Sequence, residues 1–187
     1  MNMKNITLRD ATAQDSHIIA AALSMAIGED CSRLYCGDRY MEVFEELAAS
    51  EDSQYSYRNA IVAEADGVAA GAVIGYDGAR LHELRRVTLE TIRRHTGELR
   101  QVTDETAPGE FYLDSIGVLA DFRGYGIGRK LLQAICDRAK TEGHCKAGLL
   151  VDFENPAAER LYTSIGFRRV GTNKFQGHDM WHMQMDL

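Results

Sequence analysis

Long apolar runs and proline are both scarce in this sequence. No stretch approaches the roughly 18 consecutive apolar residues that a transmembrane helix needs, and residues 1–5 lack the apolar core of a secretory signal. Only two prolines, no serine-rich stretch and no internal repeat occur in the 187 residues, so the chain shows no linker. We therefore expect a single cytoplasmic domain over residues 1–187 that does not contact a membrane.

Cysteine and positive charge are also in short supply. The four cysteines form no Cys-x-x-Cys pair, which argues against a zinc ribbon or a redox motif, and we expect reduced thiols and no bound metal. The formal net charge of −7 argues against a general nucleic-acid-binding surface. It is compatible with a basic or amine-bearing substrate, although solubility explains it equally well. Any phosphate site must then be locally basic.

Two common phosphate-binding motifs are missing from the glycine-rich stretch at residues 121–130. A P-loop requires Gly-Lys followed by Ser or Thr, and no such tripeptide occurs. The dinucleotide fingerprint requires glycines at its first, third and sixth positions. The sixth position is Arg129 when counted from Gly124, and Leu131 when counted from Gly126. Both counts therefore exclude this fingerprint.

The stretch does contain a turn between an expected strand at residues 111–118 and a helix whose apolar side chains recur every four residues from Ile127. Gly124, Gly126 and Gly128 have no Cβ, so a ligand can lie against the backbone there. The first N–H groups of a helix have no acceptor inside it, and they lie at the positive end of its dipole. The neighbouring cations are Arg123, Arg129 and Lys130. The turn therefore has the features of a phosphate-binding site. The alternative is an ordinary tight turn that binds no ligand.

A second block follows at residues 151–167. Its marker residues are Asn155, Ala158, Leu161, Tyr162, Gly166 and Phe167. In the first block, Arg123, Gly126 and Gly128 form an Arg-x-x-Gly-x-Gly motif. The two blocks in this order resemble the GCN5-related N-acetyltransferase (GNAT) superfamily. The resemblance is close over residues 111–170 and loose elsewhere.

This resemblance implies an α/β fold: a mixed sheet of about seven mostly antiparallel strands, with helices on both faces. In this family the fourth and fifth strands are parallel but splay apart. Strands are expected at residues 6–9, 59–64, 68–76, 111–118, 147–152, 167–171 and 179–186, with a hairpin turn at Asp66 and Gly67. Helices are expected after the candidate N-cap Asp15, from Tyr40, within residues 79–97, from Ile127 to about Glu142, and after Asn155.

The segments between these elements carry further expectations. Residues 28–38 are polar and are expected to be irregular. Residues 103–109 are expected to form a loop, within a connection that lies over the acceptor end of the family's site. The solvent side of the helix in residues 79–97 is expected to carry Arg85, Arg86, Arg93 and Arg94.

The resemblance also implies where acetyl-CoA binds. In the family, the pantetheine arm enters the splay and pairs with the fourth strand like an extra strand. The pyrophosphate lies on the N–H groups of the glycine-rich turn. The cofactor-binding residues expected on this basis are Ile116, Gly117, Val118, Arg123, Gly124, Tyr125, Gly126, Ile127, Gly128, Arg129, Asn155 and Tyr162.

The chemistry implied is transfer of an acetyl group from the CoA thioester to an amine. The amine must lose a proton before it attacks, which requires a base tuned near the working pH, and Asp114 is the leading candidate. Tyr162 matches the family's proton donor to the leaving thiolate, because a phenol is protonated at neutral pH. A backbone N–H near Val118 matches the donor to the thioester oxygen. The alternatives are a packed Tyr162 whose hydroxyl bonds backbone, and a structural hydrogen bond at Asp114.

Strand alternation places Asp114 on the same face as Tyr112, Ile116 and Val118, unless a bulge changes the count. The weak candidates for binding the acceptor are Tyr35, His82, Glu83, Glu110 and His182, and a structural role is open for each of them. The favoured function is acetylation of a small-molecule primary amine by direct attack in a ternary complex. Acetylation of a protein N-terminus or lysine stays open, as does a non-catalytic acyl-CoA-binding module. A homodimer is expected by analogy alone.

Overall fold

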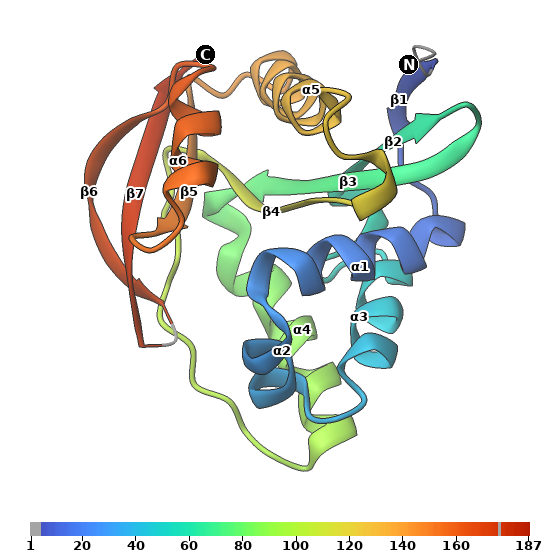
Figure 1. Ribbon diagram of the computed structural model, residues 1–187. Helices are drawn as coiled ribbons and strands as arrows, with labels where there is room; N and C mark the ends of the chain where they lie inside the picture. The colour runs from blue at the N-terminus through green and yellow to red at the C-terminus, as the bar shows by residue number, and fades with distance from the viewer. Residues whose placement is uncertain (1–4, 176) are drawn as a thin grey trace.

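The chain folds around a seven-stranded mixed sheet with helices on both faces (Figure 1). The computed structural model describes residues 5–175 and 177–187. The strands are β1 (Ile6–Asp10), β2 (Ala60–Ala65), β3 (Val68–Asp77), β4 (Phe111–Val118), β5 (Lys146–Asp152), β6 (Arg168–Phe175) and β7 (His178–Asp186). Their order is β1-β2-β3-β4-β5-β7-β6, and only β4 and β5 are parallel neighbours. This confirms the predicted fold class.

The helices form a layer on each side of the sheet. They are α1 (Ser16–Ile27), α2 (Glu29–Cys36), α3 (Tyr40–Ala49), α4 (Leu81–Thr96), α5 (Ile127–Thr141) and α6 (Pro156–Thr163). In Figure 1, α5 and α6 lie on one side of the sheet and α1 to α4 on the other. Within the described residues, no helix combines the length and the apolar composition that crossing a bilayer requires.

Each side of the sheet has its own apolar core. Ile19 of α1 belongs to one core and Ile135 of α5 to the other, and both side chains are 0% exposed. Successive side chains in a strand point to opposite faces. In β3, Val73 therefore belongs to the α5 core while Ala72 and Ile74 belong to the α1 core. The central strands are thus fixed from both sides.

The parallel strands β4 and β5 separate almost at once. Their register contains only Phe111 opposite Ala147 and Tyr112 opposite Gly148. In contrast, β5 continues beside β7 from Lys146 to Asp152. The edge of β4 that faces β5 therefore has no strand partner in the described residues beyond Tyr112. This confirms the predicted splay.

A bulge in β4 changes which residues share a face. Ile74 lies opposite Ser115 and Gly75 opposite Leu113, so Asp114 is the extra residue. Asp114 does share a side with Tyr112, because both contact Tyr76. The expectation that Ile116 and Val118 lie on that same side is wrong, since both pack in the α5 core. The bulge has inverted the alternation between Leu113 and Ile116.

Residues 28–38, expected to be irregular, contain the helix α2. Gly28 and Gly37 bracket it with φ of 85° and 80°, which only glycine adopts without strain. Ser32, Tyr35 and Cys36 form its buried side. The segment has too few apolar residues to show helical periodicity, so the prediction of an irregular segment was wrong.

Asp15 precedes α1 as predicted, but its side chain does not cap that helix. Its carboxylate accepts hydrogen bonds from the Thr12 N–H at 2.8 Å and the Thr12 hydroxyl at 3.0 Å. It also accepts two from the Arg9 guanidinium, each 2.8 Å long. These charged hydrogen bonds lower the pKa of Asp15 to about 2, against the opposing effect of burial. Asp15 therefore fixes the start of the helix through an ion pair with β1.

The helix in residues 79–97 forms as α4, and Arg86, Arg93 and Arg94 face solvent as predicted. Arg85 does not, since it is 6% exposed. Its guanidinium donates to the Asp104 carboxylate at 2.5 Å and forms an ion pair with Glu105. A charged side chain is buried only when it is paired, and this pairing is the reason the prediction for Arg85 failed. Residues 97–110 contain no helix or strand, and they include the loop that was expected at residues 103–109.

Candidate active site

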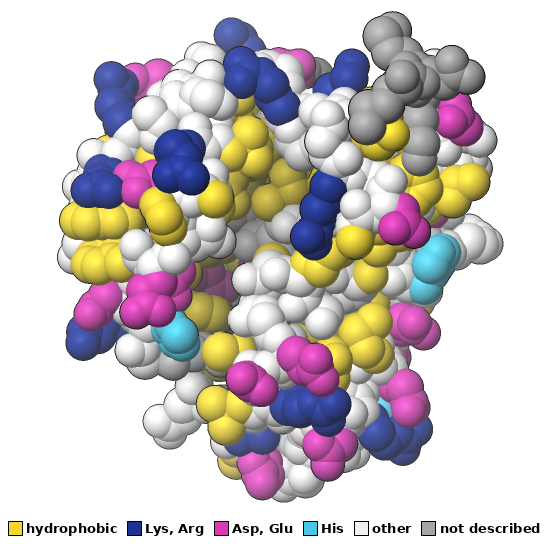
Figure 2. All heavy atoms as spheres, in the orientation of Figure 1, with side chains coloured by type: hydrophobic (Ala, Val, Ile, Leu, Met, Phe, Trp, Pro, Cys, Tyr) yellow, Lys and Arg dark blue, Asp and Glu magenta, His cyan; other side chains and the backbone are white. Residues whose placement is uncertain are grey.

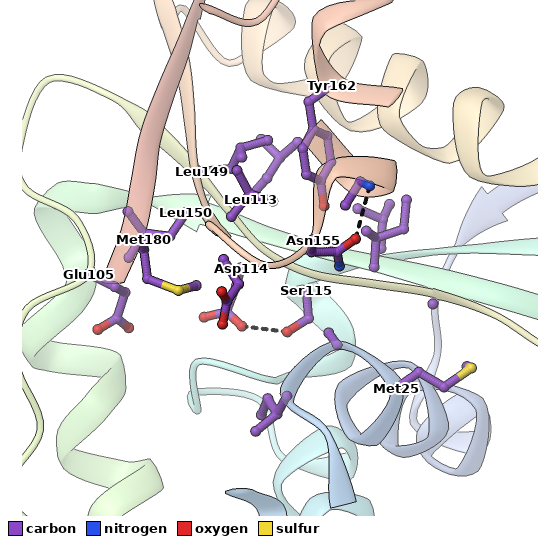
Figure 3. Close-up of a pocket in the computed structure, with 18 of the residues that line it drawn as sticks. Met25, Glu105, Leu113, Asp114, Ser115, Leu149, Leu150, Asn155, Tyr162 and Met180 are labelled. Carbon is purple, nitrogen blue, oxygen red and sulfur yellow. Dashed lines mark hydrogen bonds between the residues drawn. The ribbon is translucent and has the colours of Figure 1, made fainter. Parts of the chain in front are cut away.

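A cavity of about 400 Å³ occupies the splay between β4 and β5. Figure 2 shows the surface hollowed there, with hydrophobic side chains lining the hollow and Lys or Arg side chains beside it. Figure 3 shows residues from α1, β4, β5, α6 and β7 converging on the pocket. Seven of the predicted site residues line it: Asp114, Ile116, Gly117, Val118, Gly128, Asn155 and Tyr162. The structure therefore brings together both predicted catalytic residues and part of the predicted cofactor site.

The glycine-rich turn lies between β4 and the start of α5 and has the backbone geometry that the motif predicts. Gly124 and Gly126 have φ of 82° and 76°, and a Cβ placed on either would meet no atom within 4 Å. The backbone there is therefore open to a ligand. The N–H of Lys130 donates to the Gly126 carbonyl at 3.1 Å. This is the first hydrogen bond within α5. The N–H groups of Ile127, Gly128 and Arg129 come before it in the first turn, where a helix provides no acceptor for them.

The arginine side chains of the turn are tied to neighbouring elements. The Nε of Arg123 donates to the Val118 carbonyl at 3.1 Å, which folds the side chain back over the end of β4. Arg129 donates to the Ser164 hydroxyl at 3.0 Å and to its carbonyl at 3.3 Å, at the end of α6. Both guanidiniums stay exposed. Tyr125 is half-buried, whereas Ile127, the first residue of α5, is buried in the core on the α5 side of the sheet.

Tyr162 reaches the cavity from α6. Asn155 caps this helix, since its Oδ1 accepts the Ala158 N–H at 3.1 Å, and the Pro at the next position needs no N–H acceptor. Figure 3 shows the Tyr162 ring pointing into the pocket with its hydroxyl toward Asn155. Among the described residues the hydroxyl has no hydrogen-bond partner, so the alternative of a hydroxyl bonded to backbone does not hold. Burial raises the pKa of Tyr162 to about 12.

Asp114 reaches the cavity from the bulge in β4. Its Oδ1 accepts a hydrogen bond from the Ser115 hydroxyl at 2.8 Å, and its Oδ2 lies 3.2 Å from the Tyr76 hydroxyl. Burial, and then the negative charge of Glu105, raise the pKa of Asp114 to about 7. These effects outweigh the hydrogen bonds from Ser115 and Tyr76, which favour the charged form. A carboxyl with this pKa can both take up and release a proton at neutral pH.

Glu105 also lines the cavity, and the sequence interpretation did not find it. It is 6% exposed, and it comes from the irregular segment 97–110. Its Oε1 accepts a hydrogen bond from the Gln54 amide at 2.8 Å, and its Oε2 pairs with Arg85. Burial raises the pKa of Glu105, although the charge of Arg85 opposes this. The available signal was that Asp104 and Glu105 are the only acids in the loop expected over the acceptor end.

The residues predicted to bind the acceptor do not gather at this cavity. Tyr35 is buried in the α1 core. His82 and Glu83 are exposed on α4, where they pair with Asp104 at 3.4 Å and with Arg80 at 2.9 Å. Tyr35 does not line the cavity, and His82 and Glu83 pair with side chains outside it.

Glu110 and His182 form a separate polar cluster between the start of β4 and the strand β7. The Glu110 carboxylate lies 2.9 Å from the His182 Nε2, and it accepts hydrogen bonds from Gln184 at 2.7 Å and Thr106 at 2.7 Å. Burial alone would raise the pKa of Glu110, but these hydrogen bonds outweigh burial and lower it. Neither Glu110 nor His182 lines the cavity. This cluster instead ties the start of β4 to β7.

The cavity walls are rich in acids and lack strong bases. Glu105, Asp114 and Asp152 contribute the carboxylates, and no Lys or Arg of the described chain lines it. Asp152 lies 2.9 Å from the Nδ1 of His178. Elsewhere the walls are apolar, with Met25 and Met180 at opposite sides of the pocket (Figure 3). An ammonium group is therefore better suited to this cavity than a carboxylate. The described residues include no cluster of three or more His, Cys, Asp or Glu suited to a metal ion.

The fold and the cavity together define a class of protein, in which a splayed parallel strand pair opens toward a glycine-rich helix start. Residues 28–167 match the model of the Acetyltransferase (GNAT) family. The chain belongs to this family, as the two sequence blocks predicted.

Two relatives in the comparison with curated proteins are acetyltransferases. N-alpha-acetyltransferase RimI from Mycobacterium tuberculosis is 38% identical over 85 residues, covering 43% of this chain and 52% of that protein. Mycothiol acetyltransferase from Kocuria rhizophila is 42% identical over 66 residues, covering 35% of this chain and 21% of that protein. The chain thus spans about half of the first relative and about a fifth of the second. A crystal structure of an acetyltransferase matches 96% of this chain and 98% of its own, with a TM-score of 0.80 and 34% identity.

Proposed function

We propose that this protein transfers an acetyl group from acetyl-CoA to a primary amine of a small molecule, by direct attack while both are bound. One observation carries the proposal: Asp114 and Tyr162 line one cavity, at the splay of β4 and β5. One side chain is a carboxyl with a pKa of about 7, and the other is a phenol that stays protonated at neutral pH. The transfer needs such a base and such an acid.

Acetyl-CoA fits the two open backbone regions of the site. The unpaired edge of β4 beyond Tyr112 has N–H and C=O groups that the pantetheine amides can bond, as a further strand would. We assign Ile116, Gly117 and Val118 to this role. The pyrophosphate would lie on the N–H groups from Arg123 to Arg129, where the helix dipole favours negative charge. Asn155, which lines the cavity, would lie beside the arm.

The reaction then moves two protons. The acceptor arrives as an ammonium ion, and Asp114 takes one of its protons, directly or through a water. The free amine attacks the thioester carbon, and a backbone N–H near Val118 stabilises the charge on the carbonyl oxygen. When the carbon–sulfur bond breaks, the Tyr162 hydroxyl stabilises the departing thiolate with a hydrogen bond. The second proton of the attacking nitrogen passes to the sulfur, so that the nitrogen becomes a neutral amide. The products are the acetylated amine and free CoA.

The acceptor end of the cavity favours a compact cation. The segment 97–110 carries Glu105 into the cavity wall, and Arg85 holds this segment through Asp104 and Glu105. β6 also contacts it, since the Asn173 amide donates to the Asp104 carbonyl at 3.0 Å. The connection is thus held at Asp104 and Glu105 by α4 and at Asp104 by β6, and it forms a fixed wall at this end of the cavity. An extended polypeptide would need an open groove there.

A protein N-terminus is the second candidate acceptor. The similarity to N-alpha-acetyltransferase RimI favours it, because that relative covers 43% of this chain. The similarity to mycothiol acetyltransferase favours a small molecule, over 35% of the chain. Neither relative covers enough of its own length to decide the acceptor. The acidic cavity, with the fixed wall formed by residues 104–105, leads us to prefer the small molecule.

The test measures acetyl-CoA binding by titration calorimetry and CoA release by a thiol assay. The acceptor panel contains small primary amines, a peptide with a free N-terminus and a blocked peptide with one lysine. We expect micromolar binding, turnover with a small amine, and a loss of about 100-fold or more in Asp114→Asn. Turnover with peptides alone would contradict the acceptor class. Binding without any turnover would indicate a non-catalytic module, and no binding would contradict the whole proposal.

A further inference from the structure

Two carboxylates in the cavity wall share a single phenol. The Tyr76 hydroxyl lies 3.2 Å from the Glu105 Oε1 and 3.2 Å from the Asp114 Oδ2. The Gln54 amide donates to the Tyr76 oxygen at 3.1 Å and to the Glu105 Oε1 at 2.8 Å. Tyr76, Gln54 and Glu105 are almost fully buried. These three side chains therefore have little access to water that could replace a hydrogen bond they fail to make, whereas Asp114 is half-buried at the cavity.

The number of available protons favours a state in which one of the two carboxyls, Glu105 or Asp114, is protonated. A phenol has one proton, and the Gln54 amide already donates to its oxygen. When Glu105 and Asp114 are both ionised, only one of them can accept the phenol's hydrogen bond. The other then faces a phenol oxygen and a second negative charge. When Asp114 is protonated it can donate to Tyr76, and Tyr76 can donate to Glu105, so that both carboxyls have a hydrogen bond with the phenol.

Arg85 decides which carboxyl holds the proton. Its side chain is 7% exposed and pairs with Glu105, and a guanidinium is charged throughout the neutral range. Glu105 is therefore held ionised by its partner. Asp114 has no cationic partner in the described structure, and its other oxygen accepts only from Ser115. The shared proton is accordingly placed on Asp114.

We propose that Glu105 is a positioning residue for the transfer reaction: acting through Tyr76, its charge keeps Asp114 able to take up a proton near neutral pH. This inference rests on the proposed role of Asp114 as the base. Without Glu105, Tyr76 would donate to Asp114 and stabilise its charged form. The carboxylate would then be ionised at lower pH and would be a weaker base at neutral pH.

The tyrosines around Asp114 do not change charge in the same range. The phenols that face it come from α2, the segment after α3, β3 and β4, and they are Tyr35, Tyr55, Tyr76 and Tyr112. Burial raises the pKa of each one, so all four are neutral between pH 5 and 9. The cavity wall further contains Cys31, Asp152, Tyr162 and His178. Glu105 and Arg85 are the charges that the structure couples to Asp114.

The first measurement is the pH profile of kcat/KM for the wild type, Glu105→Gln and Glu105→Asp. In the wild type the acid limb should have its midpoint near pH 7, as Asp114 ionises. Glu105→Gln should move this midpoint down by about one pH unit, and the charge-preserving Glu105→Asp should restore most of it. Glu90→Gln on the exposed side of α4 removes a carboxylate outside the cavity and should leave the profile unchanged. An unshifted acid limb in Glu105→Gln would overturn the inference.

A second measurement needs no substrate and separates this inference from the proposed function. Protein labelled with ¹³C at the aspartate carboxyls is titrated by NMR, and Asp114→Asn identifies the Asp114 signal. The Asp114 midpoint should fall in Glu105→Gln, and an unchanged midpoint overturns the coupling even if the enzyme acetylates amines. If Glu105→Gln leaves a buried unpaired guanidinium and does not fold, Arg85→Met/Glu105→Gln removes both charges. The Asp114 midpoint should still fall in this variant, although less, because the charge of Arg85 itself lowers the pKa of Asp114.

Discussion

Replacing Tyr162 with phenylalanine removes one hydroxyl from the cavity and little else. The hydroxyl has no hydrogen-bond partner among the described residues, so its loss leaves no buried group unsatisfied. The ring keeps its edge contact with Phe167, whose centroid lies 6.2 Å away. The fold of the variant should therefore be unchanged, and any loss of activity should reflect chemistry at the thioester.

The size of that loss follows from the acidity of the phenol. Burial raises the pKa of Tyr162 to about 12, whereas an alkyl thiol has a pKa near ~8.5. Full proton transfer from the phenol to a thiolate is then uphill by roughly 3.5 pKa units, or about 5 kcal/mol. Tyr162 must act mainly as a hydrogen-bond donor to the developing thiolate, and a hydrogen bond to a charged group is worth roughly 1.5–3 kcal/mol. We expect kcat to fall by about 10- to 150-fold.

The assay is steady-state CoA release with saturating amine and varied acetyl-CoA. The KM for acetyl-CoA should change by less than about threefold, because the hydroxyl acts in the transition state and not in ground-state binding. Tyr40→Phe, which alters a tyrosine outside the cavity, provides the matched control. An unchanged kcat in Tyr162→Phe would remove Tyr162 as the donor. A raised KM with normal kcat would instead assign it to cofactor binding.

Three further predictions test other parts of the structure. Gly126→Asp should weaken CoA binding at least about tenfold more than Gly126→Asn in calorimetry, because both side chains tolerate the positive φ but only one adds negative charge; equal affinities would contradict the phosphate site. Asp15→Asn should lose about 1–2 kcal/mol of unfolding free energy at pH 7, after allowance for the solvent around Arg9. The lowered pKa of Asp15 stabilises the fold above about pH 4, so the difference from wild type should shrink as the pH falls toward 2 in urea unfolding, and a constant difference would refute the ion pair. Alaninamide should be acetylated much faster than alanine at equal concentration, because the cavity's carboxylates repel a second one; equal rates would disprove this selection.

Local chemistry in the sequence was sufficient for much of the fold. The hairpin at Asp66 and Gly67 could be predicted because both residues adopt positive φ, 54° and 81°, as a two-residue turn requires. The cap at Asn155 and the helix start at Ile127 follow from equally local rules. Tyr162 was found because it belongs to a block with fixed spacing. These features depend on residues within a few positions of one another.

The features that the sequence did not reveal depend on distant partners. Arg85 was expected in solvent, and its burial depends on Glu105, which lies in a segment with no periodicity. Glu105 was missed for the same reason, since its place in the cavity is set by Arg85, Gln54 and Tyr76. The bulge at Asp114 is visible only once β4 is aligned with β3. Long-range pairing therefore fixes the environment of the proposed base, while local rules fix the turn that is proposed to hold the phosphates.

The two-residue contact between β4 and β5 also has a mechanical meaning. It divides the sheet into two parts, β1 to β4 and β5 to β7, which share very few backbone hydrogen bonds. A ligand that fills the cavity between β4 and β5 and forms hydrogen bonds with both strands would link these two parts of the sheet. At 100 times its Kd, such a ligand adds about 2.7 kcal/mol to the unfolding free energy. The concentration of the acyl donor would then affect the stability of the folded protein as well as its turnover rate.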